Sequence, residues 1–305
     1  MINGGNNLDI NLIGVPVQYG CDKDGSQEGP GRLRELGIKE ALENNRNTVY
    51  DMGNIFVPNI LPDLKYKWHK KMKYLNPLVE INKNLAHMVY CSLSANCFPF
   101  VVGGDHSLGI GSIAGASKYF DEMAVIWVDA HGDINDLETS PSGNIHGMPL
   151  AASLGVGHSS ITNLYYEGRK IKPENVYILG ARDLDPGEIR LIEKLNINLY
   201  TIDYINSNSL DGAVKEILSK LKTSNVDSVH LSFDIDVFDE SIVPGTGTPV
   251  KDGLSFDEGR YVLDEFMGSK LITSMDFVEL NPALDQDNKT EILCMDILRF
   301  IGELL

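Results

Sequence analysis

Short runs of consecutive apolar residues recur along the whole chain and alternate with longer stretches of helical periodicity. The short runs are rich in Val, Ile and Phe and are bounded by Gly, Asn or Asp, which is typical of strands. The longer stretches carry apolar residues three and four positions apart and have Pro or acidic residues near their starts, which is typical of helices. This alternation predicts an α/β fold built on a parallel sheet.

Eight apolar runs are predicted to be strands. The run at 124–128 is apolar at every position, which indicates a parallel strand covered by helices on both faces, because a strand with one wet face would alternate. The predicted strands are residues 10–15, 49–52, 99–102, 124–128, 176–179, 198–202, 228–233 and 272–278. The clearest connecting helices are predicted at residues 187–195, 211–221 and 256–267.

The chain carries no internal repeat and no Pro- or Ser-rich linker that would separate two domains. A length of 305 residues fits one large α/β core. We therefore predict a single domain over residues 1–305, in which residues 1–8, rich in Gly and Asn, form a loose leader.

The composition is that of an ordinary globular protein, with 43% apolar and 23% charged residues. The 43 Asp and Glu residues outnumber 26 Lys and Arg, and a net charge of −17 disfavours binding to nucleic acid or to anionic membranes. The four cysteines lack CxxC spacing and are expected to be reduced thiols. No stretch approaches the ~18 apolar residues of a membrane span, and no secretory signal is recognisable, so a cytoplasmic location is expected.

The most informative motif directly follows the apolar run at 124–128. It reads Asp129-Ala130-His131-Gly132-Asp133. In an extended segment alternate residues project to one side, so both Asp side chains and the His are expected to converge. The two small residues between them leave space behind this face.

Three further predicted strands end in residues of the same chemical kind. Asp234 and Asp236 follow one strand, His106 follows another, and the last strand carries Asp276 and leads to Glu279. Because the carboxyl ends of parallel strands meet at the same edge of a sheet, we expect all of these motifs to share one rim.

Four clustered carboxylates need a counter-charge. Without one, each close pair would cost on the order of 4 kcal/mol at ~4 Å and an effective dielectric constant of ~20. Two divalent ions would balance the charge, and the excess of oxygen donors over nitrogen favours Mn²⁺ over tetrahedral Zn²⁺. Such a pair would generate hydroxide from water near neutral pH. The predicted metal ligands are His106, Asp129, His131, Asp133, Asp234 and Asp236.

Each of these residues taken alone has a simpler interpretation. A single Asp after a strand is more often a helix cap or a turn residue, and a single His is usually structural. We interpret the histidines outside the motifs in that way: His69, His87, His158 and His230. The coincidence of several Asp and His clusters, each after an apolar strand, favours the metal site.

The motifs also resemble those of a known family. Gly103-Gly104-Asp105-His106-Ser107, the segment 129–133 and Ser232-Phe233-Asp234-Ile235-Asp236 resemble the three signature motifs of the arginase/agmatinase ureohydrolases. Glu28-Gly29-Pro30 and Gly245-Thr246-Gly247-Thr248-Pro249 match as well, so the resemblance spans nearly the whole chain. It implies a three-layer α/β/α fold around an eight-stranded, mostly parallel sheet, and assembly into homo-trimers or homo-hexamers.

The same resemblance distributes the ligands between two Mn²⁺ ions per subunit. Asp129 and Asp234 would bridge both ions. His106 and Asp133 would complete one site, and His131 and Asp236 the other.

The loop at 135–147 resembles the loop of arginases, which convert L-arginine into urea and L-ornithine. By this resemblance Asn135, Ser142 and Asn144 would bind the substrate α-carboxylate, and Asp185 the α-amino group. Agmatine has no such carboxylate, so the loop favours arginine. An agmatinase or guanidinobutyrase stays an alternative, because the residues after Asp236 differ from those of many arginases. A non-catalytic metal-binding protein on the same scaffold is a further one.

Three residues are predicted to act in catalysis. Glu279 would hold the planar guanidinium through two parallel N–H bonds, with Thr248 at the same wall. Asp133 would relay a proton to the departing nitrogen, and His146, by resemblance, would exchange protons with bulk water. Nucleotide binding is disfavoured, because the glycine-rich segment 109–115 has the wrong spacing, and close helix packing is expected there instead.

Overall fold

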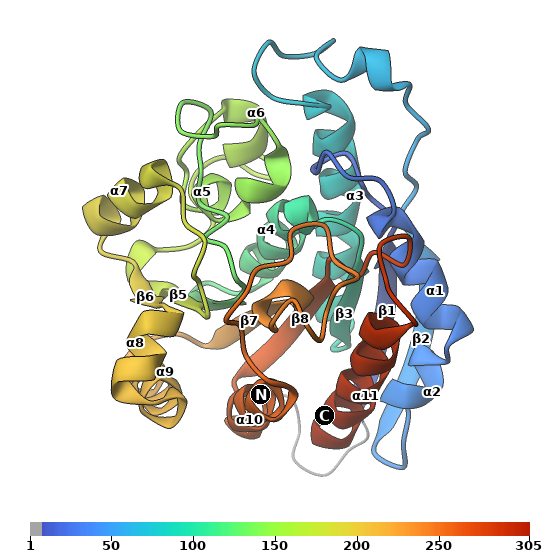
Figure 1. The fold of residues 1–305 in the computed structure, drawn as a ribbon, viewed down its shortest axis with the longest axis vertical. Coiled ribbons are helices and arrows are strands. Elements are labelled where there is room, and N and C mark those ends of the chain that lie inside the picture. Colours follow the sequence, from blue (N-terminus) through green and yellow to red (C-terminus); the bar gives the residue numbers. More distant parts are fainter. Residues whose placement is uncertain (1–7) are drawn as a thin grey trace.

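The computed structural model describes residues 8–305, which form one eight-stranded sheet between two layers of helices (Figure 1). The strands are β1 Leu8–Val15, β2 Asn47–Asn54, β3 Phe98–Gly103, β4 Met123–Val128, β5 Val176–Leu179, β6 Asn198–Tyr200, β7 Ser228–Asp234 and β8 Ile272–Val278. The helices are α1 Gly29–Glu35, α2 Ile38–Leu42, α3 Leu75–Ser94, α4 Gly109–Tyr119, α5 Pro149–Ser153, α6 Ser159–Thr162, α7 Pro186–Leu195, α8 Ile202–Asn208, α9 Leu210–Thr223, α10 Phe256–Gly268 and α11 Lys289–Leu304.

All neighbouring strands of the sheet are parallel, in the order β2-β1-β3-β8-β7-β4-β5-β6. The predicted α/β/α architecture is thus confirmed. The predicted strands and helices coincide with observed ones to within two residues at each end. Residues 1–8 were predicted to form a loose leader. This prediction was wrong for Leu8, which is the first residue of β1. The other residues of the expected leader lie outside the described residues.

The predicted strand at 198–202 extends too far. Strand β6 ends at Tyr200, and the Thr201 side chain accepts a hydrogen bond from the Tyr204 backbone N–H, 3.1 Å away. Thr201 therefore caps helix α8, which begins at Ile202. The apolar Ile202 continues the hydrophobic run of the strand, which concealed the change of structure.

The sheet separates two hydrophobic cores. Helices α2, α8, α9, α10 and α11 cover one face, and α3, α4, α5, α6 and α7 cover the other (Figure 1). Successive residues of β4 point into opposite cores, Ile126 into the first and Trp127 into the second. This explains why the strand is apolar at every position.

The glycine-rich segment at 109–115 is confirmed as a site of close helix packing. A Cβ atom on Gly111 would lie 2.5 Å from the Asn82 carbonyl oxygen, and one on Gly115 would lie 2.4 Å from that of Ala86. Helix α4 therefore approaches α3 more closely than larger residues would allow. The short 3₁₀ turn His106–Leu108, directly before α4, is held at the end of β3 by this packing.

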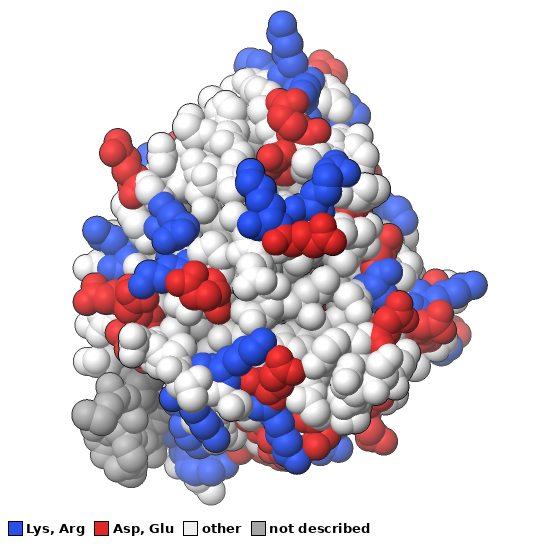
Figure 2. Space-filling view, turned by 90° about the vertical axis from the view of Figure 1, so that its left-hand side faces the viewer, with Lys and Arg blue, Asp and Glu red and all other residues white. Residues whose placement is uncertain are grey.

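Charges of both signs are mixed on the face of the molecule shown in Figure 2, where Lys and Arg clusters alternate with Asp and Glu clusters. The net negative charge is not gathered into one patch on this face. Among the described residues, no helix combines the length and the apolar character that a membrane span requires.

Candidate metal centre and substrate pocket

The four central strands, in the order β3-β8-β7-β4, carry the predicted site motifs at their carboxyl ends. Every residue in these four strands is buried. The polar side chains that follow them are therefore held at the edge of a rigid, fully covered sheet, where α/β proteins bind ligands.

One group of donor atoms surrounds His106. Its Nδ1 atom lies 3.0 Å from Asp129 Oδ2, 3.2 Å from Asp133 Oδ2 and 3.0 Å from Asp234 Oδ2. The side chain of His106 is 1% exposed and that of Asp129 is fully buried. Strands β3, β4 and β7 thus bring ligand atoms from distant parts of the sequence to a single point.

A second group adjoins the first. His131 Nδ1 lies 3.3 Å from Asp129 Oδ1 and 3.1 Å from Asp236 Oδ2. Asp129 therefore offers one oxygen to each group. Two adjacent groups that could each hold a metal ion therefore share the Asp129 carboxylate, and all six predicted ligands lie in these groups.

The surroundings of His106 fix the orientation of its ring. The ring stacks on Trp127, with centroids 3.9 Å apart and an interplanar angle of 8°. Its Nε2 atom lies 2.8 Å from Ser232 Oγ, which leaves Nδ1 facing the carboxylates. The Trp127 indole also donates to Asp129 Oδ2 at 2.9 Å. Such second partners commonly set the orientation of metal-binding histidines.

Burial makes this arrangement costly without cations. The pKa of Asp133 is raised to about 6, mainly because the carboxyl group is buried and also because the charge of Asp129 is close. Burial and the charges of Asp236 and Asp129 raise the pKa of Asp234 well above its usual range. His106 Nδ1 is a buried atom with no hydrogen-bond partner, although three carboxylates surround it. The residues present therefore fit two divalent cations bound to oxygen and nitrogen donors.

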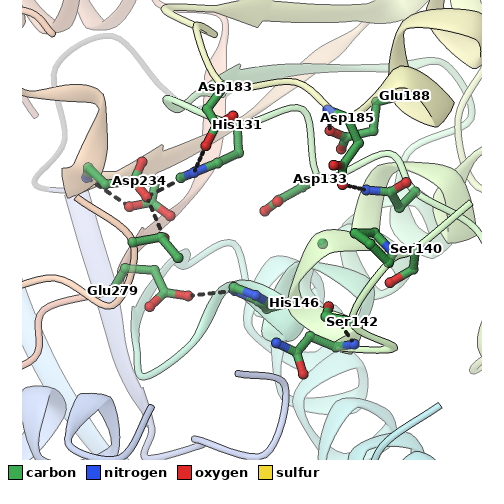
Figure 3. Close-up of a pocket in the computed structure, with 16 residues that line it drawn as sticks. His131, Asp133, Ser140, Ser142, His146, Asp183, Asp185, Glu188, Asp234 and Glu279 are labelled. Atoms are coloured by element: carbon green, nitrogen blue, oxygen red, sulfur yellow. Dashed lines mark hydrogen bonds and ion pairs between the residues drawn. The ribbon is translucent and has the colours of Figure 1, made fainter. Parts of the chain in front are cut away.

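A cavity opens above the two groups (Figure 3). Glu279 and Asp234 lie on one side of it and Ser142 lies across from them, with Asp133 pointing into the space between. Of the predicted site residues, those that line the cavity are His131, Asp133, Asn135, Ser142, Asn144, His146, Asp185, Asp234, Asp236, Thr248 and Glu279. His106 and Asp129 are buried in the cluster below.

Glu279 follows β8 in a left-handed conformation, with φ +69°. Its Oε1 atom accepts the His106 backbone N–H at 2.8 Å and lies 3.5 Å from His146 Nδ1 (Figure 3). Its Oε2 atom is buried without a partner. Burial alone would lower the pKa of His146, but the hydrogen bond to Glu279 and the charge of Glu279 raise it to about 9. Glu279 thus has one carboxylate oxygen without a partner at the wall of the cavity.

The opposite side of the cavity carries amide and carboxylate groups. Asn135 Nδ2 donates to Asp185 Oδ2 at 2.9 Å, and Asn135 Oδ1 is buried without a partner. Asp185 caps helix α7. The Asn144 backbone N–H donates to Ser142 Oγ at 3.2 Å, so this pair is ordered within one loop. Thr248 Oγ1 donates to Asp236 Oδ2 at 3.1 Å, so Thr248 orients a candidate metal ligand and also lines the cavity.

Several lining residues were not predicted: Ser140, Pro141, Gly147, Asp183 and Glu188. A sequence signal existed for Glu188. It stands three residues after Asp185, and together they form a capping box at the start of α7. The Glu188 Oε1 atom also accepts the Ile134 backbone N–H at 3.0 Å, which ties the helix to the segment after Asp133.

The prediction that Asp276 lies at the rim was wrong. It sits within β8 and faces the core, where its Oδ2 atom lies 3.0 Å from His230 Nε2 and accepts a hydrogen bond from Ser112. The strand continues for two residues beyond Asp276, so only Glu279 reaches the edge of the sheet. His230, interpreted as structural, is the buried partner of this carboxylate.

The comparisons with known proteins agree with this geometry. The sequence model described as the Arginase family matches residues 8–302. An arginase from Bacillus subtilis is 44% identical over 281 residues, covering 92% of this chain and 93% of that protein. The crystal structure of arginase from Bacillus cereus superposes with a TM-score of 0.89 at 40% identity, covering 97% of this chain and 98% of the other.

A more distant structure, Entamoeba histolytica arginase in complex with L-ornithine, is 32% identical and has a TM-score of 0.86, covering 97% of this chain and 99% of the other. The fold and the site define a hydrolase of the ureohydrolase type. The chain belongs to the arginase family. The predicted family and enzyme class are thereby confirmed.

Proposed function

We propose that this protein is a manganese-dependent arginase that hydrolyses the guanidinium group of L-arginine to urea and L-ornithine. The observation that carries the proposal is the shared Asp129 carboxylate between two donor groups, directly below a cavity that contains the unpaired Oε2 atom of Glu279. The names of the relatives from Bacillus and the L-ornithine bound to the Entamoeba enzyme support the choice of substrate.

The six predicted ligands would hold two Mn²⁺ ions per subunit. His106 and Asp133 would complete one site and His131 and Asp236 the other, with Asp129 and Asp234 shared. When bound, the ions would supply the Lewis-acid activation that makes water a nucleophile near neutral pH. The donor set contains only oxygen and nitrogen, which suits Mn²⁺.

Glu279 is the proposed binding group for the substrate guanidinium. Its Oε2 atom is free and its Oε1 atom is already oriented by the His106 backbone N–H. A carboxylate fixed in this way can accept N–H groups from a planar cation and place the guanidinium carbon over the cluster. Thr248 forms the adjacent wall.

The amino-acid end of the substrate would lie at the other side of the cavity. Asn135, Ser142 and Asn144 are neutral groups that would receive the α-carboxylate, and the Asp185 carboxylate would attract the α-ammonium group. Neutral donors are suited to an anion that must approach a cluster rich in carboxylates.

Two residues are proposed to move protons. Asp133, between the cluster and the cavity, would take up the proton that the attacking water group releases and pass it to the departing nitrogen as the carbon–nitrogen bond breaks. His146 lies next to Glu279 and lines the same cavity, so it can exchange protons with water that enters. Neither role requires a residue outside the observed pocket.

The metal requirement can be tested by removing the ions. Chelated, metal-free protein should release no urea from L-arginine, and added Mn²⁺ should restore the activity while Mg²⁺ at the same concentration should not. Urea release is measured with arginine, agmatine and guanidinobutyrate in parallel. Full activity of metal-free protein would refute the metal-dependent mechanism. Faster turnover of agmatine or guanidinobutyrate than of arginine would assign one of the alternative ureohydrolase activities, and no turnover of any would favour a non-catalytic protein.

We also propose a cytoplasmic homo-oligomer, trimeric or hexameric, as the resemblance to ureohydrolases implies. Light scattering of the purified protein measures its mass against the 33.6 kDa of one chain. A mass of one or two chains would contradict this part of the proposal.

A further inference from the structure

Lys73 is a buried lysine behind the wall of the substrate cavity. It is 5% exposed and lies just before helix α3, far in sequence from every predicted site residue. Its Nζ atom donates to Asn144 Oδ1 at 2.8 Å and to the Asp22 carboxylate. Asn144 lines the cavity, whereas Lys73 does not. The side chain of Lys73 therefore reaches the wall of the substrate pocket through the Asn144 amide.

This contact decides which end of the Asn144 amide faces Lys73. An asparagine side chain can rotate by half a turn and exchange its carbonyl oxygen for its NH₂ group. A lysine ammonium group has three donors and no acceptor, so only the oxygen can face it. The NH₂ group is then left for the other neighbours of Asn144, which are the Asp22 carboxylate and the cavity. Without Lys73 no cation would hold the Asn144 oxygen, and an orientation that presents this oxygen to a substrate carboxylate would become accessible.

The backbone at Lys73 holds the same loop in place. The Lys73 N–H donates to the Gly143 carbonyl oxygen at 3.0 Å. Gly143 adopts φ +74°, and a Cβ atom on it would lie 1.9 Å from the Lys71 carbonyl oxygen. The segment 71–73 thus lies against the loop that carries Ser142 and Asn144, with no space for a side chain between them.

Asp22 balances the charge of the buried lysine. Its side chain is 53% exposed, so it can be hydrated while it accepts a hydrogen bond from Lys73. The Asp22 carboxylate is thus the counter-ion of the Lys73 ammonium group, which has hydrogen-bond donors only.

We propose that Lys73 is a positioning residue that fixes the donor end of the Asn144 amide toward the cavity and so selects substrates that carry a carboxylate. The inference rests on the proposed function, because it assigns Asn144 to the α-carboxylate of arginine. Lys73 acts on binding and not on the reacting guanidinium. Its effect is therefore the same in the ground state and in the transition state.

The test compares Lys73→Met with the matched variant Lys71→Met. Lys71 lies two residues away and pairs with Glu138 at 2.7 Å on the surface. Lys73→Met should raise the KM for arginine about tenfold, the effect of one lost hydrogen bond to a charged group, with kcat within about twofold. Lys71→Met should leave both constants within about twofold. Agmatine, used as a substrate or as a competitive inhibitor, should bind both variants as it binds the wild type.

Two further measurements separate positioning from a general structural role. Lys73→Arg keeps a head group with donors only and should restore most of the affinity. In an Asn144→Ala background, Lys73→Met should add little to the KM, because the amide that it orients is gone. Thermal unfolding of the manganese-loaded variants confirms that they are folded.

The proposal is overturned if Lys73→Met leaves the KM for arginine unchanged or if the affinity for agmatine falls to the same extent. It is also overturned if Lys73→Met raises the KM for arginine as much in the Asn144→Ala background as in the wild type. A Lys73→Arg variant as impaired as Lys73→Met would also overturn it. Wild-type protein with no arginine hydrolysis would instead refute the proposed function, so the two failures are distinguishable.

Discussion

Glu279 links the candidate metal cluster to the cavity at the scale of a single residue. One oxygen accepts the backbone N–H of His106, and the other is buried and free. The backbone of Glu279 has a positive φ angle, which residues other than Gly rarely adopt. Asp133 also has a positive φ, of +47°. Such strain persists only where the surrounding structure enforces it, and it gathers at functional sites.

Replacing Glu279 by Gln should separate charge from shape. The Glu279→Gln side chain keeps an acceptor for the His106 N–H but has no charge to pair with a guanidinium. We expect kcat/KM for arginine to fall about 100-fold, which corresponds to about 2.7 kcal/mol and lies within the range for a buried hydrogen bond between charged groups. The stoichiometry of bound Mn²⁺, measured on the dialysed protein, should be unchanged. Glu138→Gln, an exposed change in the loop of the pocket, serves as the control, and equal activity of both variants would remove Glu279 from substrate binding.

That the six candidate ligands lie close together could be predicted at this scale, because each belongs to a short motif at the end of an apolar strand. Lys73 could not be predicted, since nothing near it in the sequence indicates that its partner is Asn144, 71 positions away. Asp276 was misplaced for the opposite reason. A carboxylate near a strand end resembles a ligand in sequence, whereas its burial beside His230 depends on how β7 and β8 align.

Arg182 shows how elements, more than single residues, hold the site together. It follows β5 and donates from its guanidinium to backbone carbonyl oxygens of a distant segment, including those of Asp236 at 2.8 Å and Val250 at 3.0 Å. This segment carries both a candidate metal ligand and Thr248. Arg182 thus joins the loop after β5 to the loop after β7.

Removing this connection should reduce stability. Arg182→Met would remove the side-chain donor of several half-buried carbonyl oxygens, among them those of Asp236 and Phe238, and we expect the free energy of unfolding to fall by about 2–4 kcal/mol. Urea denaturation followed by circular dichroism measures the change. Arg190→Met, an exposed position on α7, should alter it by less than about 0.5 kcal/mol. Similar stability of the two variants would show that the carbonyl oxygens are satisfied by other means.

Elements with regular burial patterns were accessible from the sequence, and those fixed by a single cap were not. Strand β5 has the predicted bounds because the polar Asn175 precedes it and Gly180, with φ +98°, follows it. The predicted strand at 198–202 extends beyond β6, because Ile202 continues the apolar run although Thr201 already caps helix α8. The contacts of Arg182 left no periodic signal, because backbone carbonyl oxygens are present at every position.

At the scale of the whole molecule, the sheet gathers like charges at its centre. The carboxyl ends of β4 and β7 place Asp129, Asp133, Asp234 and Asp236 in a buried cluster, and each of them is at most 6% exposed. Folding of the metal-free chain must therefore work against repulsion between these groups as well as their loss of hydration. Bound cations would turn the same cluster into a stabilising feature.

This balance predicts opposite effects of one substitution in the two forms of the protein. A ligand that binds only the folded state at 100 times its Kd adds about 2.7 kcal/mol of stability, so Mn²⁺ should raise the Tm of the wild type by several degrees. Asp236→Asn removes one negative charge with little change in shape, so in chelator its Tm should equal or exceed that of the wild type, while its response to Mn²⁺ should be much smaller. Asp121→Asn, at an exposed position, should keep the full response. If manganese raises the Tm of Asp236→Asn as far as that of the wild type, Asp236 is not a metal ligand. The charge of the clustered carboxylates must then be balanced by other groups.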